Sequence, residues 1–141
     1  MNVLERLKGY IEKEHLLMPH HKVLLTVSGG KDSMLMAHLF VKAGYTLAIA
    51  HCNFKLRGTD SDEDEALVRK FAMENNVPIF VRHFDTKAYA KERQISIQMA
   101  ARELRYAWFE KLRHEMGFDR IAVAHHLNDH IETVLLNLCR G

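Results

Sequence analysis

The sequence has few cysteines and no long apolar run. Only Cys52 and Cys139 occur among the 141 residues, and no C-x-x-C pair is present, which argues against a disulfide scaffold, a zinc ribbon or a CxxC-held iron–sulfur cluster. No apolar segment reaches the ~20 residues of a membrane span, and the N-terminus lacks a basic stretch followed by an apolar core. These absences predict a cytoplasmic protein with no membrane partner.

A strong charge of either sign is also missing. Lys and Arg number 20 and Asp and Glu 18, which gives a formal net charge of +2 at pH 7. This charge is too small to predict a nucleic-acid partner by itself, although local arginine clusters could still bind one. With 48% hydrophobic and 27% charged residues and no repeats, the composition predicts one globular domain with a real core.

The apolar periodicity predicts strands that alternate with helices. We expect strands at residues 22–28, 46–53, 79–84 and 120–124, and helices at 3–14, 33–43, 61–75, 96–115 and from about 128 onward. Ser61 and Asp64 have the spacing of a capping box at the start of the third helix. The series predicts an α/β fold with a doubly wound, Rossmann-like parallel sheet of four to five strands and helices on both faces. Ligands of such sheets bind beyond the carboxyl ends of the strands.

The most informative segment is Ser28-Gly29-Gly30-Lys31-Asp32-Ser33, which joins an apolar strand to an apolar helix. The two glycines let main-chain N–H groups come close to a ligand. The helix start that follows favours an anion, and the two serines add hydroxyl donors. Neither a Walker loop nor a G-x-G-x-x-G fingerprint explains the turn. We therefore expect a phosphate site, with an ordinary capped strand-to-helix turn as the alternative.

Two further segments carry candidate binding groups. His51, Asn53 and Arg57 follow the second strand, and the acidic run after them lacks the glycine and the glutamate of a calcium loop. In the helix that begins near residue 96, Arg102 and Arg105 lie on neighbouring faces, where they could clamp a phosphate. Each of these residues could instead end a strand or belong to a solvated surface.

The loop after the fourth strand contains His125 and His126, followed by Asp129 and Glu132. The two carboxylates lie one helical turn apart, so they could hold Mg²⁺ through oxygen or water. Zinc is disfavoured because H-E-x-x-H is absent and two of the histidines are adjacent. A cap at Asp129 and a surface position for Glu132 are the alternative.

Together these segments resemble the tRNA(Ile)-lysidine synthetase family, within the adenine-nucleotide alpha-hydrolase or PP-loop ATP pyrophosphatase superfamily. GMP synthetases, asparagine synthetases and tRNA thiolation enzymes share the SGGxDS loop. The motifs HxN-x-x-LRG with SDxDE, S-x-Q-x-x-AR-x-x-RY and AHHxxDxxET, in this order, narrow the match over residues 20–141. Phe54 stands where the family often has His, and Asn128 and His130 stand where it often has Asp and Gln.

The resemblance implies a ligase that uses ATP to adenylate the C2 oxygen of the wobble cytidine in tRNA(Ile) with a CAU anticodon. Pyrophosphate leaves in this step, and the amine of L-lysine then displaces AMP. The implied roles are ATP binding by residues 28–33, Mg²⁺ binding by Asp32, Asp129 and Glu132, and neutralisation of phosphate charge by Arg102 or Arg105. The implied candidates for contacts with cytidine and lysine are His51, Asn53, Arg57, His125 and His126.

The family's catalytic domain continues beyond the length of this chain. We therefore expect residues 1–141 to be an N-terminal ATP-binding (PP-loop) domain, cut short at its C-terminal end, with no lysidine-forming activity alone. A tRNA 2-thiolation enzyme of the same superfamily and a non-catalytic adenine-nucleotide-binding module are the alternatives. The oligomeric state is open, with a homodimer as one candidate.

Overall fold

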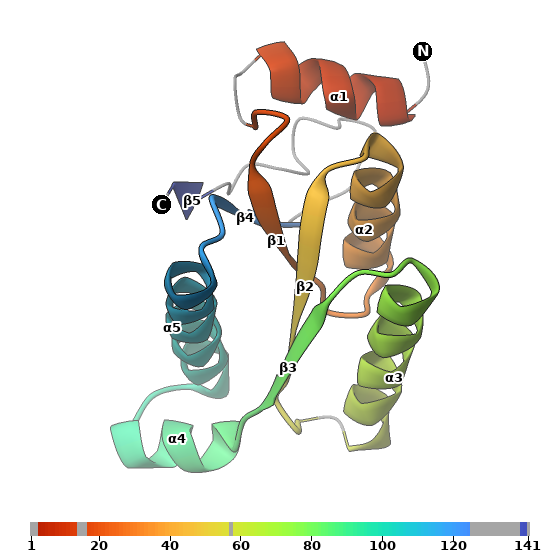
Figure 1. Ribbon diagram of the computed structural model, residues 1–141. Helices are drawn as coiled ribbons and strands as arrows, with labels where there is room; N and C mark the ends of the chain where they lie inside the picture. Colours follow the sequence, from red (N-terminus) through yellow and green to blue (C-terminus); the bar gives the residue numbers. More distant parts are fainter. Residues whose placement is uncertain (1–2, 14–16, 57, 125–138, 141) are drawn as a thin grey trace.

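The computed structural model describes residues 3–13, 17–56, 58–124 and 139–140, in which helices and strands alternate (Figure 1). The strands are β1 (Lys22–Thr26), β2 (Thr46–Asn53), β3 (Ile79–His83), β4 (Arg120–Val123) and β5 (Cys139–Arg140). The helices are α1 (Val3–Lys13), α2 (Lys31–Ala43), α3 (Thr59–Glu74), α4 (Thr86–Arg93) and α5 (Ile97–Met116).

The strands form one sheet in the order β3-β2-β1-β4-β5. β1 pairs in parallel with β2 and with β4, so that Thr26 at its carboxyl end lies beside Ala50 and Val123. The chain first moves outward from β1 to β3 and then returns through α4 and α5 to β4. The strand order therefore reverses at β1, and the carboxyl ends of β1 and β4 flank the switch point at which such sheets bind ligands.

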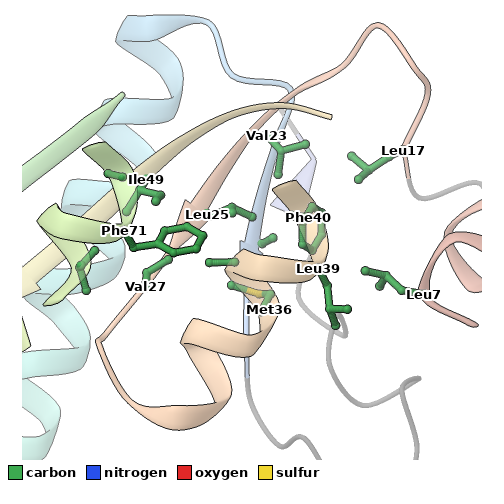
Figure 2. Packing of buried hydrophobic residues seen from close by; sticks show 14 of the residues in the cluster. Leu7, Leu17, Val23, Leu25, Val27, Met36, Leu39, Phe40, Ile49 and Phe71 are labelled. Carbon is green, nitrogen blue, oxygen red and sulfur yellow. The ribbon is translucent and has the colours of Figure 1, made fainter. Parts of the chain in front are cut away.

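Helices α2 and α3 pack on one face of the sheet, and α1 packs against α2 (Figure 1). Val23, Leu25 and Val27 alternate along the first strand and just beyond it, and they contact this layer, which includes Phe40 of α2 and Phe71 of α3 (Figure 2). All five side chains are buried. Because neighbouring strand residues point to opposite faces, this alternation fixes which residues beyond β1 face α2 and α3.

Helix α5 packs on the opposite face. Leu24 of β1 and the small residues Ala48 and Ala50 of β2 lie against Phe109 and Leu112 of this helix. The sheet is thus buried on both faces, as parallel sheets require. The predicted doubly wound parallel sheet with helices on both faces is confirmed for the four longer strands; the two-residue β5, antiparallel to β4, was not predicted.

Most expected boundaries hold to within one or two residues, with β1 ending at Thr26 instead of residue 28. Two helix starts and one helix differ from the sequence-based expectation. Helix α2 begins at Lys31, and α3 begins at Thr59 because Gly58, with a φ of 56°, turns the chain into the helix early. Ser61 therefore lies inside the first turn of α3, and the prediction that it caps this helix was wrong. Helix α4 was missed; its cap is Asp85, whose carboxylate accepts a hydrogen bond from the Ala88 N–H at 3.2 Å.

The helix predicted from about residue 128 lies outside the described residues. No helix in the described ranges has both the length and the apolar character needed to cross a membrane.

Candidate functional site

The turn between β1 and α2 is ordered by its two serines. Ser33 Oγ accepts hydrogen bonds from the N–H groups of Ser28 and Gly29 at 3.1 and 3.2 Å, and the Ser33 hydroxyl donates to Gly30 O at 3.1 Å. Ser28 Oγ accepts from the Gly30 N–H at 3.2 Å. The two hydroxyls therefore hold the turn together, and their predicted role as donors to a ligand stays a prediction.

The start of α2 is open to a ligand at its N-cap. The N-cap residue is Gly30, which makes no side-chain capping hydrogen bond. A helix start offers several N–H groups without intrahelical partners and carries a positive partial charge. Lys31 is exposed and Asp32 is half-buried in the same first turn. This arrangement suits an anion such as a phosphate.

Gly29 is required by its backbone and by a close approach of α3. Its φ is +94°, and a Cβ atom at this position would lie 2.9 Å from Asp64 Cβ and 3.1 Å from Asp64 O. No side chain larger than hydrogen fits there without moving α3 at Asp64. The glycine turn is thus packed directly against the acidic segment that follows β2.

A cavity of about 180 Å³ lies beyond the carboxyl ends of β1, β2 and β4, on the side of α5. Ala50, Phe109 and Val123 give it an apolar wall, and Ser28 and Arg105 give it polar groups. It lies at the switch point of the sheet, next to the glycine turn. A ligand with a flat apolar group and an attached anion suits this cavity, because the apolar group can contact the apolar wall and the anion can contact the polar groups.

Arg105 is the cation of this cavity. Its Nε is buried and has no hydrogen-bond partner among the described residues, and its Cζ lies 5.1 Å from the centre of the Tyr106 ring. A buried guanidinium N–H without a partner is costly, so this edge favours an anionic ligand. Arg102 is exposed, lies 5.3 Å from the same ring and does not line the cavity. Of the two predicted arginines, the geometry brings Arg105 to the site.

Cys52 also lines this cavity, and its thiol is neutral. Burial raises the pKa of Cys52 to about 12, although Arg105 and Arg82 act in the opposite direction. The thiolate is the reactive form of cysteine. Cys52 is therefore a wall of the cavity and not a nucleophile.

His51 faces the other side of β2 and is 2% exposed. Its Nδ1 lies 2.7 Å from Val27 O, and because a carbonyl oxygen only accepts, Nδ1 carries the proton. Its Nε2 is buried and has no hydrogen-bond partner in the described part of the chain. His51 thus links β2 to Val27, the residue before the glycine turn. Its Nε2 is the ring nitrogen for which the described residues provide no hydrogen-bond partner.

A second cavity of about 170 Å³ lies on this side, between the end of β2 and α3. Its lining residues are Ser28, His51, Cys52, Asn53, Phe54, Leu56, Ser61 and Asp64. Ser28, Cys52 and Phe54 line both cavities and divide them. The sequence motifs did not single out Cys52, Leu56 or Asp64 as individual site residues. The features that could have identified them are the alternation of residues at the end of β2 and the acidic run that follows it.

Asn53 holds the loop after β2 to α3. Its side chain is 1% exposed and donates to Asp62 Oδ1 at 3.0 Å and to Glu65 Oε1 at 3.1 Å. Asn53 Oδ1 accepts from the Lys55 N–H at 3.0 Å, which supports the left-handed φ of 57° at Lys55. Its predicted contact with a substrate stays a prediction, and its local bonds give it a positioning role.

Glu65 is the most strongly perturbed carboxylate of this region. Burial raises its pKa, but hydrogen bonds from Asn53, His83 and Arg69 lower it more, so that the pKa of Glu65 is about 2. The carboxylate is therefore charged at all physiological pH values. Its hydrogen bonds to Asn53 and His83 tie the N-terminal part of α3 to the ends of β2 and β3.

The remaining predicted site residues are Arg57, His125, His126, Asp129 and Glu132, and they lie outside the described residues. Within the described ranges, no group of three or more His, Cys, Asp or Glu side chains is placed to hold a metal ion. Asp32 is the one predicted Mg²⁺ ligand that the structure describes. The predicted three-residue Mg²⁺ site therefore stays a prediction.

A glycine turn at the switch point of a parallel sheet, an uncapped helix start and an arginine with a buried Nε define an α/β domain suited to phosphate-containing ligands. Residues 2–141 match the family model of the PP-loop domain, and the chain belongs to that family. Membership in a family of ATP-binding domains confirms the predicted use of ATP.

The chain is similar to curated proteins named tRNA(Ile)-lysidine synthase. It is 49% identical over 139 residues to the one from Bacteroides thetaiotaomicron and 50% identical over 139 residues to the one from Parabacteroides distasonis. These matches cover 99% of this chain and 33% and 32% of the two relatives. The chain thus spans about a third of the length of the curated relatives it matches. The predicted family resemblance is confirmed.

Among solved structures, the chain is similar to an NH3-dependent NAD synthetase from Campylobacter jejuni. The TM-score is 0.67 at 16% sequence identity, over 86% of this chain and 56% of that chain. At this identity the likeness concerns the fold alone, and it agrees with the predicted Rossmann-like α/β class.

Proposed function

We propose that the chain is the ATP-binding domain of a tRNA(Ile)-lysidine synthase. The observation that carries this proposal is the 49–50% identity, along 99% of the chain, to proteins of that name. The names of these relatives favour this ligase over a tRNA 2-thiolation enzyme and over a non-catalytic nucleotide-binding module. Residues 1–141 then form the N-terminal ATP-binding domain, which activates the substrate only together with the further length that the relatives possess.

In this proposal ATP lies across the switch point of the sheet. The phosphates lie at the turn 28–33, where the uncapped start of α2 and the backbone at the two glycines favour an anion. The adenosine lies in the α5-side cavity, against the apolar wall of Ala50, Phe109 and Val123. Arg105 reaches the α-phosphate from the same cavity and satisfies its buried Nε.

The metal of the reaction is Mg²⁺, which accompanies ATP and neutralises phosphate charge when bound. We propose Asp32, in the first turn of α2, as one oxygen ligand, together with Asp129 and Glu132. A hard cation that keeps several waters is commonly bound by one or two carboxylates plus the substrate phosphates. Asp32 fits such a site because it lies within the turn where the phosphates are proposed to bind.

The proposed reaction has two steps. The C2 oxygen of the wobble cytidine, in tRNA(Ile) with a CAU anticodon, attacks the α-phosphorus of ATP and pyrophosphate leaves. An amino group of L-lysine then attacks C2, AMP leaves with the oxygen, and the amine loses a proton. The protein supplies positioning and charge stabilisation and no covalent nucleophile, which agrees with the neutral thiol of Cys52.

The cytidine and lysine are proposed to meet the chain at His51, Asn53, Arg57, His125 and His126. We propose that the reaction takes place in the cytoplasm, without a membrane partner. A homodimer, the assembly considered from the sequence, would be detected by sedimentation equilibrium of the purified chain.

The first experiment measures nucleotide binding by the chain. We expect calorimetry with Mg²⁺ to show binding of ATP in preference to GTP, and Asp32→Ala to weaken ATP binding about 10- to 100-fold, the effect of one lost charged contact. Asp85→Ala is the matched control, because Asp85 caps α4 and lines neither cavity. Equal affinity in all three proteins would contradict the assignment of the turn as a nucleotide site.

The second experiment measures the ligation itself. The chain replaces the matching third of the Bacteroides thetaiotaomicron relative, and transfer of labelled lysine to a tRNA(Ile) transcript with a CAU anticodon is followed. We expect the chimera to transfer lysine and the chain alone to transfer none. A chimera that binds ATP but leaves the transcript unmodified would refute the proposed function.

A further inference from the structure

A third cavity lies between the end of β3 and the helices α4 and α5. Figure 1 shows how β3 leads into α4 and how α5 returns from it along the sheet. The volume of about 230 Å³ exceeds that of either cavity described above. No lining residue is shared with those two cavities. The proposed reaction therefore assigns no ligand to this third cavity.

Aromatic rings form one wall of the third cavity. The rings of Phe84 and Trp108 meet edge to face, with their centres 6.2 Å apart and an angle of 75° between their planes. Phe84 is buried, whereas Trp108 and Tyr89 are half-buried and offer part of their surface to the cavity. Flat aromatic surfaces stack on other flat rings, including all four nucleobases. This wall favours a ligand with a flat ring.

The polar groups of the third cavity suit a phosphate and a base. Arg82 and Lys111 are exposed cations on the lining, and the Arg82 guanidinium lies 5.3 Å from the centre of the Phe84 ring. Glu103 is the acidic residue of the lining, and its Oε2 accepts a hydrogen bond from the Tyr89 hydroxyl at 2.9 Å. The two cations can contact phosphate oxygens, and a carboxylate oxygen can accept from the amino group of a base.

The charges of the surrounding segments favour a polyanion on this side of the sheet. Residues 82–111 contain seven Lys and Arg and four Asp and Glu, a net charge of +3 with His neutral, compared with +2 for the whole chain. Helix α3, on the opposite face of the sheet (Figure 1), contains six acidic and two basic residues, a net charge of −4. Such a separation directs a polyanion to α4 and α5 and away from α3. An acidic peptide would match the cations but would bring no flat ring to the aromatic wall.

We propose that the third cavity binds one unpaired nucleotide of a single-stranded RNA segment. Trp108 contacts the base, and Arg82 and Lys111 contact the flanking phosphates. The proposal rests on the proposed function in one respect, since the RNA is then the anticodon loop of the tRNA, in which the bases are unpaired and accessible. Phe54 lines both other cavities and stacks on Phe84, with the ring centres 5.7 Å apart. The bound nucleotide is therefore a neighbour of the wobble cytidine and not the cytidine itself.

The test uses the fluorescence of Trp108, which is the only tryptophan among the 141 residues. A dye-labelled, short single-stranded RNA with the sequence of the anticodon loop is titrated into the chain without ATP. The emission of Trp108 and the anisotropy of the dye are followed together. We expect the RNA to quench the emission with saturation, because a base stacks on the indole ring, and both signals to give the same dissociation constant.

Two other probes distinguish RNA from related ligands. Free CMP and an oligoglutamate peptide, at the same concentrations as the RNA, should leave the emission of Trp108 unchanged. Equal quenching by CMP would make this a site for a free nucleotide, and binding of the peptide with equal affinity would make it a site for acidic peptides. Either result would overturn the assignment to RNA.

Two matched pairs of variants locate the binding. Ala107→Leu fills the third cavity, and Ala66→Leu places the same side chain at an exposed position of α3. Lys111→Glu and Lys70→Glu both reverse an exposed lysine that lies near a glutamate four residues later, on α5 and on α3 respectively. We expect Ala107→Leu and Lys111→Glu to raise the dissociation constant for RNA about tenfold. The two α3 variants should change it less than about twofold, and equal effects within each pair would overturn the proposal.

The outcomes separate this inference from the proposed function. Absence of RNA binding, or binding seen by anisotropy without a change in Trp108 emission, would overturn the nucleotide site in the third cavity. In a chain that binds ATP and whose chimera transfers lysine, either result leaves the proposed function standing. Quenching by RNA in a chain whose chimera leaves the transcript unmodified would support the nucleotide site and contradict the proposed function.

Discussion

Replacement of Gly29 by alanine tests the junction between the glycine turn and α3. The new methyl group would lie 2.9 Å from Asp64 Cβ and within 3.2 Å of the backbone of Asp64. These atoms belong to the helix itself and cannot rotate away. The N-terminal part of α3 would have to move, and it also carries Asp64, which lines the cavity between β2 and α3.

The magnitude of the effect follows from two costs. An alanine at a φ of +94° loses about 1–2 kcal/mol relative to glycine because its Cβ clashes with its own backbone. Crowding in a packed region adds about 1–3 kcal/mol. We therefore expect Gly29→Ala to lower the free energy of unfolding by about 2–5 kcal/mol, a large part of the ~5–15 kcal/mol of an ordinary domain.

The assay is urea denaturation of three matched glycine variants. Gly30→Ala has an ordinary φ of −73°, and its methyl group would lie 3.4 Å from Ser28 Oγ, so it should cost less than about 1 kcal/mol. Gly9→Ala, in α1 with nothing within 4 Å, should stabilise the chain by about 0.5–1 kcal/mol. If Gly29→Ala unfolds with the same midpoint and slope as Gly30→Ala, α3 does not pack on the turn in solution.

Three further predictions concern polar groups. The pKa of Glu65 falls from its ordinary value of 4.5 to about 2 in the folded chain. The ionised carboxylate therefore stabilises the folded state fully above about pH 4.5, and this contribution is lost as the pH falls towards 2. Urea midpoints should fall less steeply across this window in Glu65→Gln than in the parent. Asn53→Leu leaves the carboxylates of Asp62 and Glu65 without their buried donor and should cost about 2–4 kcal/mol; a melting temperature within a degree of the parent would contradict this role. Arg105→Met should weaken ATP binding in calorimetry about 10- to 100-fold, and Arg102→Met should change it less than threefold; the reverse order would place the wrong arginine in the cavity.

The sequence was sufficient for the strand-and-helix series and for the location of the glycine turn. Apolar runs such as residues 22–28 mark buried parallel strands, and the SGGKDS segment marks the turn at the switch point. Helix α4 escaped prediction because Thr86–Arg93 has almost no apolar periodicity and depends on its cap at Asp85. The start of α3 was misplaced because the backbone angle of Gly58 does not follow from its neighbours.

The site was less predictable because it depends on contacts between distant segments. Gly29 and Asp64 are far apart in sequence, and their close approach comes from the packing of α3 on the turn. The choice of Arg105 over Arg102 depends on which face of α5 meets the sheet, which two adjacent aromatic residues, Trp108 and Phe109, left open in the sequence. His51 was recognised as a candidate, but its tautomer follows only from the carbonyl of Val27.

The order of the sheet also determines how the chain resists aggregation. In the described part of the chain β5 covers the outer edge of β4, while β3 forms the other edge. An uncovered strand edge can pair with the same edge of another molecule and nucleate fibrillar growth. β3 is five residues long, and its last two residues are the exposed Arg82 and His83. Short length and charge at this edge oppose such pairing. We therefore expect Arg82 and His83 to limit aggregation of the chain at high protein concentration, whether or not a nucleotide is bound.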